Sequence, residues 1–532
     1  MRTKKPYQAT WLIAVLWLGA CAAMRDTGPA RQETHLTGFR PAGQVVNLAR
    51  AADGGEGAGI TAVGHHEAAA GVNRGVQRKF SDVLGDWKGA IVVADTSIYL
   101  TIHLDAEDGE LRGHLNIPEI GAQEEPLSEI LREGERLRFE LPGEPVPGVF
   151  ETTLAGERMQ GRFTYLDLKG AFWAERIEGT SPRAKSAYRE EEIELRSEDV
   201  ELAGTLTLPK SRGRHPAVVL VSAAGPKDRR AEIAGFPLFQ VLAHHLTRAG
   251  FAVLRMDDRG SGESTGRLAD ATREELAGDV QAAVDYLQQR KDIASQGIGL
   301  LGFGEGGLVV PEVARENRDV AFVVLLGGSA LSGERVLLEQ SATLLEGAGF
   351  SADEVEKQLD FQKKILRHVR ANAGWEELEA TLFEMLRDEM QSLPVEERGA
   401  LGDAELWARL AAKEQIDKIQ SPWFRSFLEY DPGPVLAQID VPVLAVFGGL
   451  DRQLVVAEHT RAMRQAFAKN ENDDTTIAVI PGANHLMQAA KTGQMDEYLR
   501  LEPAFEPAFT QLLIRWLDER TLGAKKSFAG KE

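Results

Sequence analysis

The chain lacks several features that mark particular classes of protein. It has one cysteine in 532 residues, so no intramolecular disulfide bond is possible. Its 61 Lys and Arg residues are outnumbered by 81 Asp and Glu, which gives a formal net charge of −20. Nucleic-acid binding requires a basic surface to face the phosphates, so this balance argues against a nucleic-acid partner. The remaining composition, 43% hydrophobic and 27% charged, is ordinary for a soluble globular protein of two or three domains.

The first apolar run is short and ends at the only cysteine. Residues 9–20 follow basic residues at positions 2, 4 and 5, the pattern of a secretory signal too short to span a bilayer. The sequence Leu-Gly-Ala-Cys that ends at Cys21 resembles the lipobox of bacterial lipoproteins, in which the cysteine is acylated. The resemblance predicts a signal peptide over residues 1–21 and a lipid-anchored protein of the cell envelope, at the outer membrane. An ordinary signal peptide that contains a cysteine is the alternative.

Two regions of different character follow this signal. Residues 22–79 are rich in Gly and Ala and show no sustained periodicity, which predicts a flexible tether. Residues 80–180 show short runs with period-two alternation, separated by turn residues such as Asp108-Gly109. Evenly spaced runs of this kind predict an antiparallel β-domain, either a small barrel or a sandwich.

Residues 188–522 alternate between strand and helix patterns. Strands are expected at residues 217–221, 251–255, 298–301, 320–326, 443–447 and 477–480. Such alternation predicts a mostly parallel sheet that helices cover on both faces. The interval from about 329 to 437 has amphipathic helical sequence and no strand pattern, so we expect a helical cap inserted into this α/β domain.

The strand at residues 298–301 ends in a turn crowded with glycine, Gly302-Phe303-Gly304-Glu305-Gly306, and a helical pattern starts at once. This is the Gly-x-nucleophile-x-Gly form of the turn that holds the nucleophile of an α/β-hydrolase. Gly304 occupies the central position, where a serine is expected. The glycines also fit the G-x-G-x-x-G dinucleotide fingerprint, but the next strand ends without the carboxylate that this motif needs.

Two later loops carry the residue types that accompany such a nucleophile. Asp451 follows the strand at 443–447 and His485 follows the last strand, which gives the order nucleophile, acid, histidine. Asp451 would orient the imidazole of His485, and His485 would serve as general base. The backbone N–H groups of Ala224 and Glu305 are expected to form the oxyanion hole. Because these donors belong to the main chain, they do not depend on the side chain at Gly304. No metal site is predicted.

These stretches together resemble a group of secreted bacterial α/β-hydrolases, described as serine-aminopeptidase-like or esterase-like, that often carry an N-terminal β-domain. Members of the group read Gly-His-Ser-Glu-Gly-Gly at the turn, where this chain has Phe303 and Gly304. The resemblance implies a small-molecule ester, amide or peptide-like ligand, a membrane contact through the lipid anchor, and no cofactor. It is carried by the stretches at residues 222–228, 257–264, 302–307, 421–425, 430–432, 448–451 and 481–485.

The missing serine leaves more than one function open. Removing the serine of such a triad costs up to about 10⁶ in turnover in a well-studied case, so hydrolysis is predicted to be impaired or lost. One alternative is an active hydrolase in which His485 and Asp451 activate water or another nucleophile, although Ser222 and Ser329 do not lie on the turn. The other alternative is a non-catalytic lipoprotein that binds a ligand or acts as a scaffold.

Overall fold

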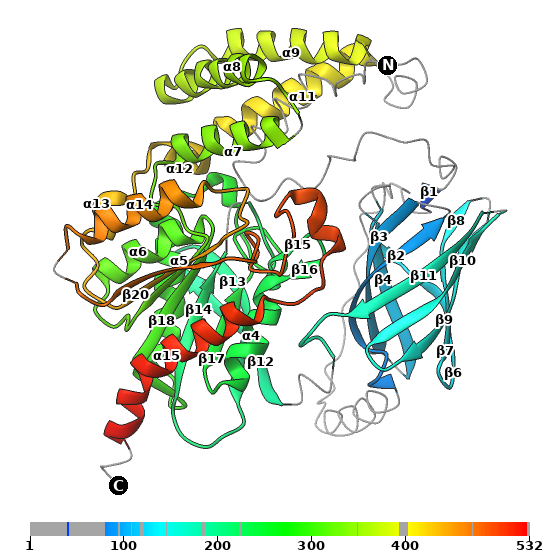
Figure 1. The fold of residues 1–532 in the computed structure, drawn as a ribbon, viewed down its shortest axis with the longest axis horizontal. Coiled ribbons are helices and arrows are strands. Elements are labelled where there is room, and N and C mark those ends of the chain that lie inside the picture. The colour runs from blue at the N-terminus through cyan, green and yellow to red at the C-terminus, as the bar shows by residue number, and fades with distance from the viewer. Residues whose placement is uncertain are drawn as a thin grey trace, which may run out of the picture. The chain divides into compact units, whose positions relative to one another are not determined.

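A computed structural model describes residues 40–41, 80–93, 96–107, 109–117, 122–144, 146–166, 168–181, 187–222, 225–347, 349–392, 403–470 and 472–528. These residues fall into two compact units, one within Gly28–Ser186 and one within Ala187–Glu532 (Figure 1). Among their helices, none combines the length and the apolarity that crossing a bilayer requires. The predicted signal peptide, the lipidation site at Cys21 and all of the predicted tether except residues 40–41 lie outside the described residues.

The first unit is a nine-stranded antiparallel sheet in the order β5-β4-β3-β2-β11-β10-β9-β7-β6, which curls toward a barrel (Figure 1). Alternate side chains of its strands are buried, as in β9, and the buried rings of Phe139 and Phe150 stack at 4.7 Å between centroids. The predicted antiparallel β-domain is therefore confirmed. Its strands are β2 Gly85–Val93, β3 Thr96–Glu107, β4 Glu110–Ile117, β5 Ala122–Pro126, β6 Ser128–Glu133, β7 Arg136–Leu141, β9 Gly148–Ala155, β10 Arg158–Tyr165 and β11 Leu168–Arg176, and β1 Arg40–Pro41 pairs with β8 Gly143–Glu144.

The second unit is built on an eight-stranded sheet in the order β12-β13-β17-β14-β18-β19-β20-β21. The pairs β12–β13 and β13–β17 are antiparallel, and the pairs from β17 to β21 are parallel. The inner parallel strands are mostly apolar, which is why they can be buried on both faces, whereas the edge strand β21 is only partly buried. The strands are β12 Tyr188–Ser197, β13 Val200–Pro209, β14 His215–Val221, β17 Ala252–Met256, β18 Ile293–Phe303, β19 Val323–Leu326, β20 Val443–Gly448 and β21 Thr475–Ile480, with a small hairpin of β15 Glu232–Ile233 and β16 Phe236–Pro237.

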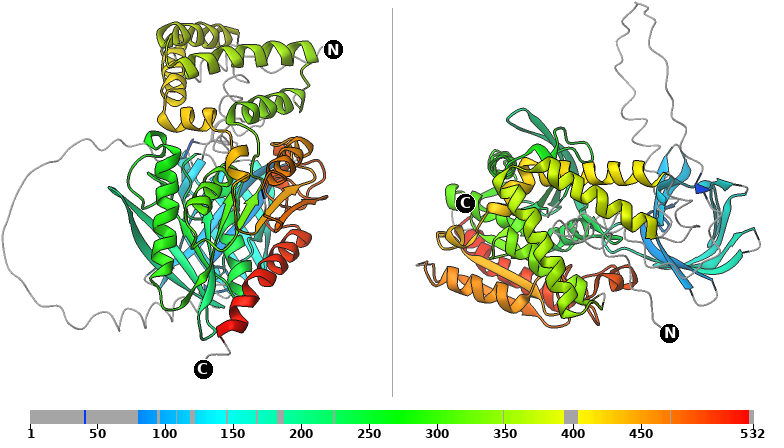
Figure 2. Two further views of the ribbon diagram at one scale, coloured as in Figure 1. Left: turned by 90° about the vertical axis from the view of Figure 1, so that its left-hand side faces the viewer. Right: turned by 90° about the horizontal axis from the view of Figure 1, so that it is seen from above.

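Helices cover both faces of this sheet (Figures 1 and 2). The helices α4 and α15 lie on one face, and α5 and α6 lie on the other. The predicted doubly covered, mostly parallel sheet is therefore confirmed. The elements outside the helical insertion are α4 Leu238–Arg248, η2 Leu268–Asp270, α5 Arg273–Gln288, α6 Gly306–Glu316, α14 Val456–Phe467, η3 Met495–Arg500 and α15 Pro507–Phe528.

A helical insertion lies between β19 and β20. Its helices α8, α9 and α11 form a group farther from the sheet than α7 and α12 (Figure 1), with a buried apolar cluster that includes Ile365, Leu382 and Ile416. Helix α8 begins with a capping box, in which the N–H of Ser351 donates to Glu354 at 2.8 Å. The helices are α7 Gly333–Gly347, α8 Ala352–Ala371, α9 Trp375–Ser392, α11 Ala404–Ile419, α12 Pro422–Glu429 and α13 Gly433–Leu436.

Candidate active site

The turn between β18 and α6 has the shape that the sequence predicts. Gly304 follows the last residue of β18 with φ = +54°, and its N–H donates to the carbonyl of Leu326 on the neighbouring strand at 2.9 Å. The carbonyl of Gly304 accepts from the N–H of Gly307 at 3.1 Å, so the chain enters the helix at once. This is a sharp strand-to-helix elbow with residue 304 at its apex, in the left-handed region that glycine adopts without strain.

Two glycines flanking the elbow are required by close backbone approach. A Cβ atom at Gly302 would lie 2.4 Å from the carbonyl oxygen of Gly306, across the turn. A Cβ atom at Gly306 would lie 2.3 Å from the carbonyl oxygen of Val221 at the end of β14. Real Cβ atoms do not approach other atoms so closely, so any side chain here would push the elbow away from β14. The Gly-x-x-x-Gly spacing thus has a packing cause at both ends.

His485 and Asp451, predicted from their order in the sequence, lie together. The Nδ1–H of His485 donates to Oδ2 of Asp451 at 2.7 Å, and the two side chains are only 3% and 0% exposed. The other carboxylate oxygen, Oδ1, accepts the N–H groups of Gln453 at 2.8 Å and Leu454 at 3.0 Å. Both oxygens of Asp451 are therefore held, which fixes the imidazole with Nε2 as the nitrogen that can accept a proton.

The imidazole of His485 is packed against the elbow strand and the next strand. Its ring centroid lies 5.2 Å from that of Phe303, the residue before Gly304. A Cβ atom at Gly327, which has φ = +59° and follows β19, would lie 2.9 Å from Cε1 of His485. The histidine is thus brought to the elbow, as the sequence predicts, and glycine at 327 provides the space for its ring.

Of the two predicted oxyanion donors, Glu305 lies within the described residues and Ala224 does not. Glu305 is the N-cap residue of α6, at the end of the helix where backbone N–H groups point away from the helix. Ala224 lies outside the described residues. Its loop begins at Ser222, whose carbonyl oxygen would lie 2.5 Å from a Cβ atom at Gly306, so the start of the loop touches the elbow. The oxyanion roles of both residues remain predictions.

The same end of the sheet holds a second polar pair that the sequence did not predict. Oγ of Ser222, after β14, lies 2.6 Å from both carboxylate oxygens of Asp258, after β17. The N–H of Lys227 also donates to Asp258, at 2.9 Å. Burial raises the pKa of the Asp258 carboxyl group to about 7, although the hydrogen bonds from Ser222 and Lys227 act in the opposite direction.

A hollow of about 60 Å³ lies beside the elbow, among the ends of β14 and β17, helices α5 and α6, and Trp423 of the insertion. Its polar and charged lining consists of Ser222, Asp257, Asp258, Arg259, Asp279 and Glu305, together with Gly306, the first residue of α6. Its apolar lining consists of Leu202, Leu220, Val221, Met256, Leu268, Leu276, Val280, Val309 and Trp423. A concave apolar site with a few converging polar groups is the usual form of a small-molecule site.

The turn after β17, within residues 257–264, braces this hollow. Asp257 accepts the backbone N–H of Arg229 at 2.7 Å and its Nη2 at 2.6 Å. Arg259 forms an internal ion pair, with Nε and Nη2 2.7 and 2.8 Å from the two oxygens of Asp279. These buried bidentate pairs fix the base of the hollow, because neither partner can leave without stranding the other charge.

Comparison with known proteins assigns the part of the chain that holds these residues to a family. A profile described as the alpha/beta hydrolase family matches residues 218–499 of the chain. The chain belongs to this family. The match covers the elbow, the loops of Asp451 and His485, the pair formed by Ser222 and Asp258, and the insertion, so all these features belong to the hydrolase unit.

Similar individual proteins include esterases. The esterase EstD of Thermotoga maritima is 26% identical over 286 residues, which are 54% of this chain and 58% of EstD, so the match spans less than two thirds of that esterase. An uncharacterized 31.7 kDa protein of Escherichia coli is 26% identical over 255 residues, 47% of this chain and 77% of that protein. Among solved structures, the Pyrococcus furiosus esterase Pf2001 has 15% identity and a TM-score of 0.40, and covers 64% of this chain and 94% of its own. This α/β hydrolase is therefore related to esterases.

The insertion of the hydrolase unit is fixed to the elbow helix by an arginine. Arg273, the first residue of α5, forms an ion pair with the buried Glu312 of α6, and its guanidinium group lies 4.2 Å from the ring centroid of Tyr430. The hydroxyl of Tyr430 donates to the carbonyl of Leu308 at 3.3 Å, one turn into α6. Burial raises the pKa of Tyr430 to about 12, so the hydroxyl remains a neutral donor at physiological pH. These contacts join the end of α12 to the helix that follows the elbow.

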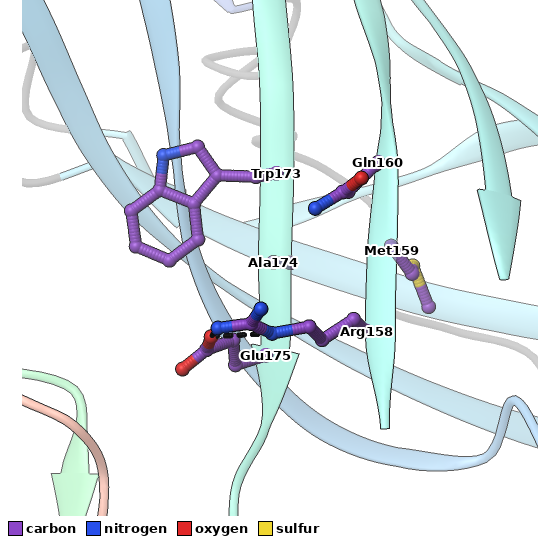
Figure 3. Close-up of a pocket in the computed structure, with 6 residues that line it drawn as sticks. All are labelled: Arg158, Met159, Gln160, Trp173, Ala174 and Glu175. Atoms are coloured by element: carbon purple, nitrogen blue, oxygen red, sulfur yellow. Dashed lines mark hydrogen bonds and ion pairs between the residues drawn. The ribbon is translucent and has the colours of Figure 1, made fainter. Parts of the chain in front are cut away.

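A larger hollow, of about 300 Å³, lies in the β-unit and is distant in sequence from the hydrolase residues. Figure 3 shows that it is lined by the adjacent strands β10 and β11, where Gln160 stands opposite Trp173. Nε of Arg158 donates to Glu175 at 2.8 Å at its edge. These residues include no nucleophile and no acid–histidine pair, so the candidate active site is the one at the elbow.

Proposed function

We propose that this α/β hydrolase is a relative of the esterases whose elbow carries no nucleophile, so that serine-dependent hydrolysis is impaired or lost. The observation that carries the proposal is Gly304 at the apex of the elbow, beside an intact pair of His485 and Asp451. The base and its orienting acid are both in place, but a base accelerates acyl transfer only when it has a nucleophile to deprotonate. With no hydroxyl at residue 304, water is the only nucleophile that His485 has at the apex.

The geometry of the turn supports a stable fold without the serine. A non-glycine residue at φ = +54° is strained, and such strain is stored in active sites for function. Gly304 removes that strain because glycine adopts positive φ readily. Glycine in place of serine at residue 304 therefore removes the attacking oxygen but stabilises the elbow.

The ligand we propose is a small ester, amide or peptide-like molecule. The hollow beside the elbow offers an apolar wall and the polar groups of Ser222, Asp258 and Glu305, which suits a molecule with one short apolar group and one polar group. A protein that binds such a ligand without cleaving it is the second candidate function, favoured by the persistence of the hollow and of the acid–histidine pair.

We also propose that the protein is anchored to the cell envelope, at the outer membrane, through an acylated Cys21. The support is the sequence Leu-Gly-Ala-Cys after a short apolar run at the N-terminus. Metabolic labelling with palmitate tests this: label that persists in Cys21→Ser would contradict the proposal.

The sharpest test of the missing nucleophile is to restore it. Gly304→Ser is expected to raise the turnover of p-nitrophenyl acetate by at least about 10³, because the loss of such a serine costs up to about 10⁶. Gly304→Ala is the matched control, since it adds the same Cβ at positive φ but no oxygen, and it should show no gain. A Gly304→Ser protein with native circular dichroism and no gain over Gly304→Ala would overturn the proposal.

A further inference from the structure

The pair of Ser222 and Asp258 has the composition of a nucleophile and its base. We propose that Ser222 is a second nucleophile, activated by Asp258, that cleaves esters of short acyl groups without help from His485. The inference rests on the proposed function, because a serine-free elbow leaves any remaining turnover to groups outside it. The elbow site and the Ser222 site use different residues on different strands, and Ser222 pairs with Asp258 and not with His485. Substitutions can therefore separate their contributions to turnover.

The geometry of the pair fits proton transfer. Oγ of Ser222 lies 2.6 Å from Oδ1 and from Oδ2 of Asp258, within the distance at which a base takes a proton from a nucleophile. The N–H of Lys227 donates to Oδ2 at 2.9 Å and orients the carboxylate, as a third group orients the base of a triad. By contrast, the hydroxyl of Ser329 is engaged by its own loop, since it donates to the carbonyl of Leu331 at 2.9 Å and accepts its N–H at 2.9 Å.

The proton affinity of Asp258 suits a base that works near neutral pH. Burial raises the pKa of its carboxyl group to about 7, and the neighbouring charge of Asp257 raises it further, whereas Lys227 lowers it. The other charged residues that line the same hollow are Asp257, Arg259, Asp279 and Glu305. A general base is most effective when its pKa lies near the working pH. In other enzymes a histidine imidazole often meets this condition.

The N-terminus of α6 provides stabilisation for a negative oxygen. Gly306, the first residue of this 11-residue helix, lines the hollow that Ser222 and Asp258 also line. Backbone N–H groups in the first turn of a helix, with the helix dipole, favour an anion at that end. An oxyanion formed by attack of Ser222 would therefore develop in a hollow that the N-terminus of α6 also lines.

The size and lining of the hollow define the class of substrate. About 60 Å³ is room for a few water-sized groups, so an acyl group of two to four carbons fits and a long chain does not. Its walls include Met256, Leu276, Val309 and Trp423, which suit the methyl end of a short acyl group. The proposed substrates are acetyl and other short-chain esters.

The reaction balances without any further reactant except water. Asp258 takes the hydroxyl proton of Ser222 as Oγ bonds to the carbonyl carbon of the ester. The carbon–oxygen bond to the alcohol then breaks, and the alcohol leaves with the proton from Asp258. Water next loses a proton to Asp258 and attacks the acyl-serine, which releases the carboxylic acid and returns the proton to Ser222.

The experiment measures hydrolysis of p-nitrophenyl acetate by the full chain and maps a fluorophosphonate adduct by peptide mass spectrometry. Ser222→Ala and Asp258→Asn should each lower the residual turnover at least 10-fold, while Ser329→Ala, the matched serine control, leaves it unchanged. The wild-type rate should rise as pH rises through about 7, because the ionised form of Asp258 is the base. The adduct should map to Ser222, and p-nitrophenyl octanoate should be a poorer substrate.

A second variant guards against a folding defect. Ser222→Cys retains a nucleophile, so its turnover should be abolished by iodoacetamide, whereas Ser329→Cys should be insensitive. Turnover that survives in Ser222→Ala, Asp258→Asn and His485→Ala alike would overturn this inference alone. Turnover lost in His485→Ala would instead overturn the proposed function, because the elbow would then be active. A folded wild-type protein with no turnover above buffer also overturns the inference.

Discussion

The hydrolase unit carries two polar pairs on opposite sides of one elbow, and they differ in what they lack. His485 and Asp451 follow β21 and β20, and they form a buried pair of imidazole and carboxylate. The residue at the apex of the elbow after β18 is Gly304, which has no side chain. Ser222 and Asp258 follow β14 and β17, on the other side of β18, and they combine a hydroxyl group with a carboxylate at a small hollow. Because each part of the site is supplied by a separate strand end, one part can be lost while the others keep their geometry.

The largest effect is expected from a substitution that displaces only the ring of His485. In a Gly304→Ser background, Gly327→Ala would place a Cβ atom 2.9 Å from Cε1 of His485, at a φ of +59° that disfavours a side chain. A displacement of about 1 Å can cost on the order of 10²-fold in rate, so the gained turnover should fall by that amount. Turnover that depends on Ser222 should not change.

The neighbouring glycine supplies the control for that experiment. A Cβ atom at Gly328 would lie 3.4 Å from Cβ of Leu325, an ordinary contact, and Gly328 is not at positive φ. Gly328→Ala should therefore leave the gained turnover within a few-fold. Equal losses for Gly327→Ala and Gly328→Ala, measured with p-nitrophenyl acetate, would mean that the ring of His485 is not the group affected.

The second and smaller effect concerns the carboxylate side and appears as a pH dependence of stability. Burial raises the pKa of Asp258 from 3.8 to about 7 in the folded protein, so between these values the folded state binds more protons than the unfolded state. This contribution to stability is complete below about pH 4 and is lost as pH rises through 7. Asp258→Asn should flatten the fall in the free energy of unfolding across that window, measured by urea titration at several pH values.

Asp228→Asn removes a carboxylate from the same loop and controls for the change in net charge. Its side chain accepts the backbone N–H of Arg230 at 2.9 Å, whereas the hydroxyl of Ser222 donates to Asp258. If Asp258→Asn keeps the wild-type pH dependence, or if Asp228→Asn flattens it equally, the proton affinity assigned to Asp258 is wrong.

The sequence was sufficient for the features that are local. The glycine turn at residues 302–306 predicts the elbow because Gly302 and Gly306 are needed for backbone contact, and the structure shows both contacts. The loops of Asp451 and His485 follow apolar strands of a parallel sheet, whose ends meet at one edge. Their pairing at 2.7 Å follows from that placement.

Features that depend on contacts between distant loops were not predicted. Ser222 and Asp258 are 36 residues apart, and no spacing rule connects a serine after one strand with an aspartate after its neighbour. The start of β12, at Tyr188, lies in a charged stretch, residues 188–192, which has no strand pattern of its own. There, pairing with β13 decides the structure, since Tyr188 stands opposite Pro209 in a register fixed by the tight turn after Ser197.

His485 is proposed to have no nucleophile to activate at the elbow. Turnover of p-nitrophenyl acetate by four proteins tests this proposal directly: wild type, His485→Ala, Gly304→Ser and the double variant. We expect that removing His485 changes the rate less than about two-fold in the wild type and by on the order of 10³ or more in the Gly304→Ser background. A wild-type rate that collapses when His485 is removed would contradict it.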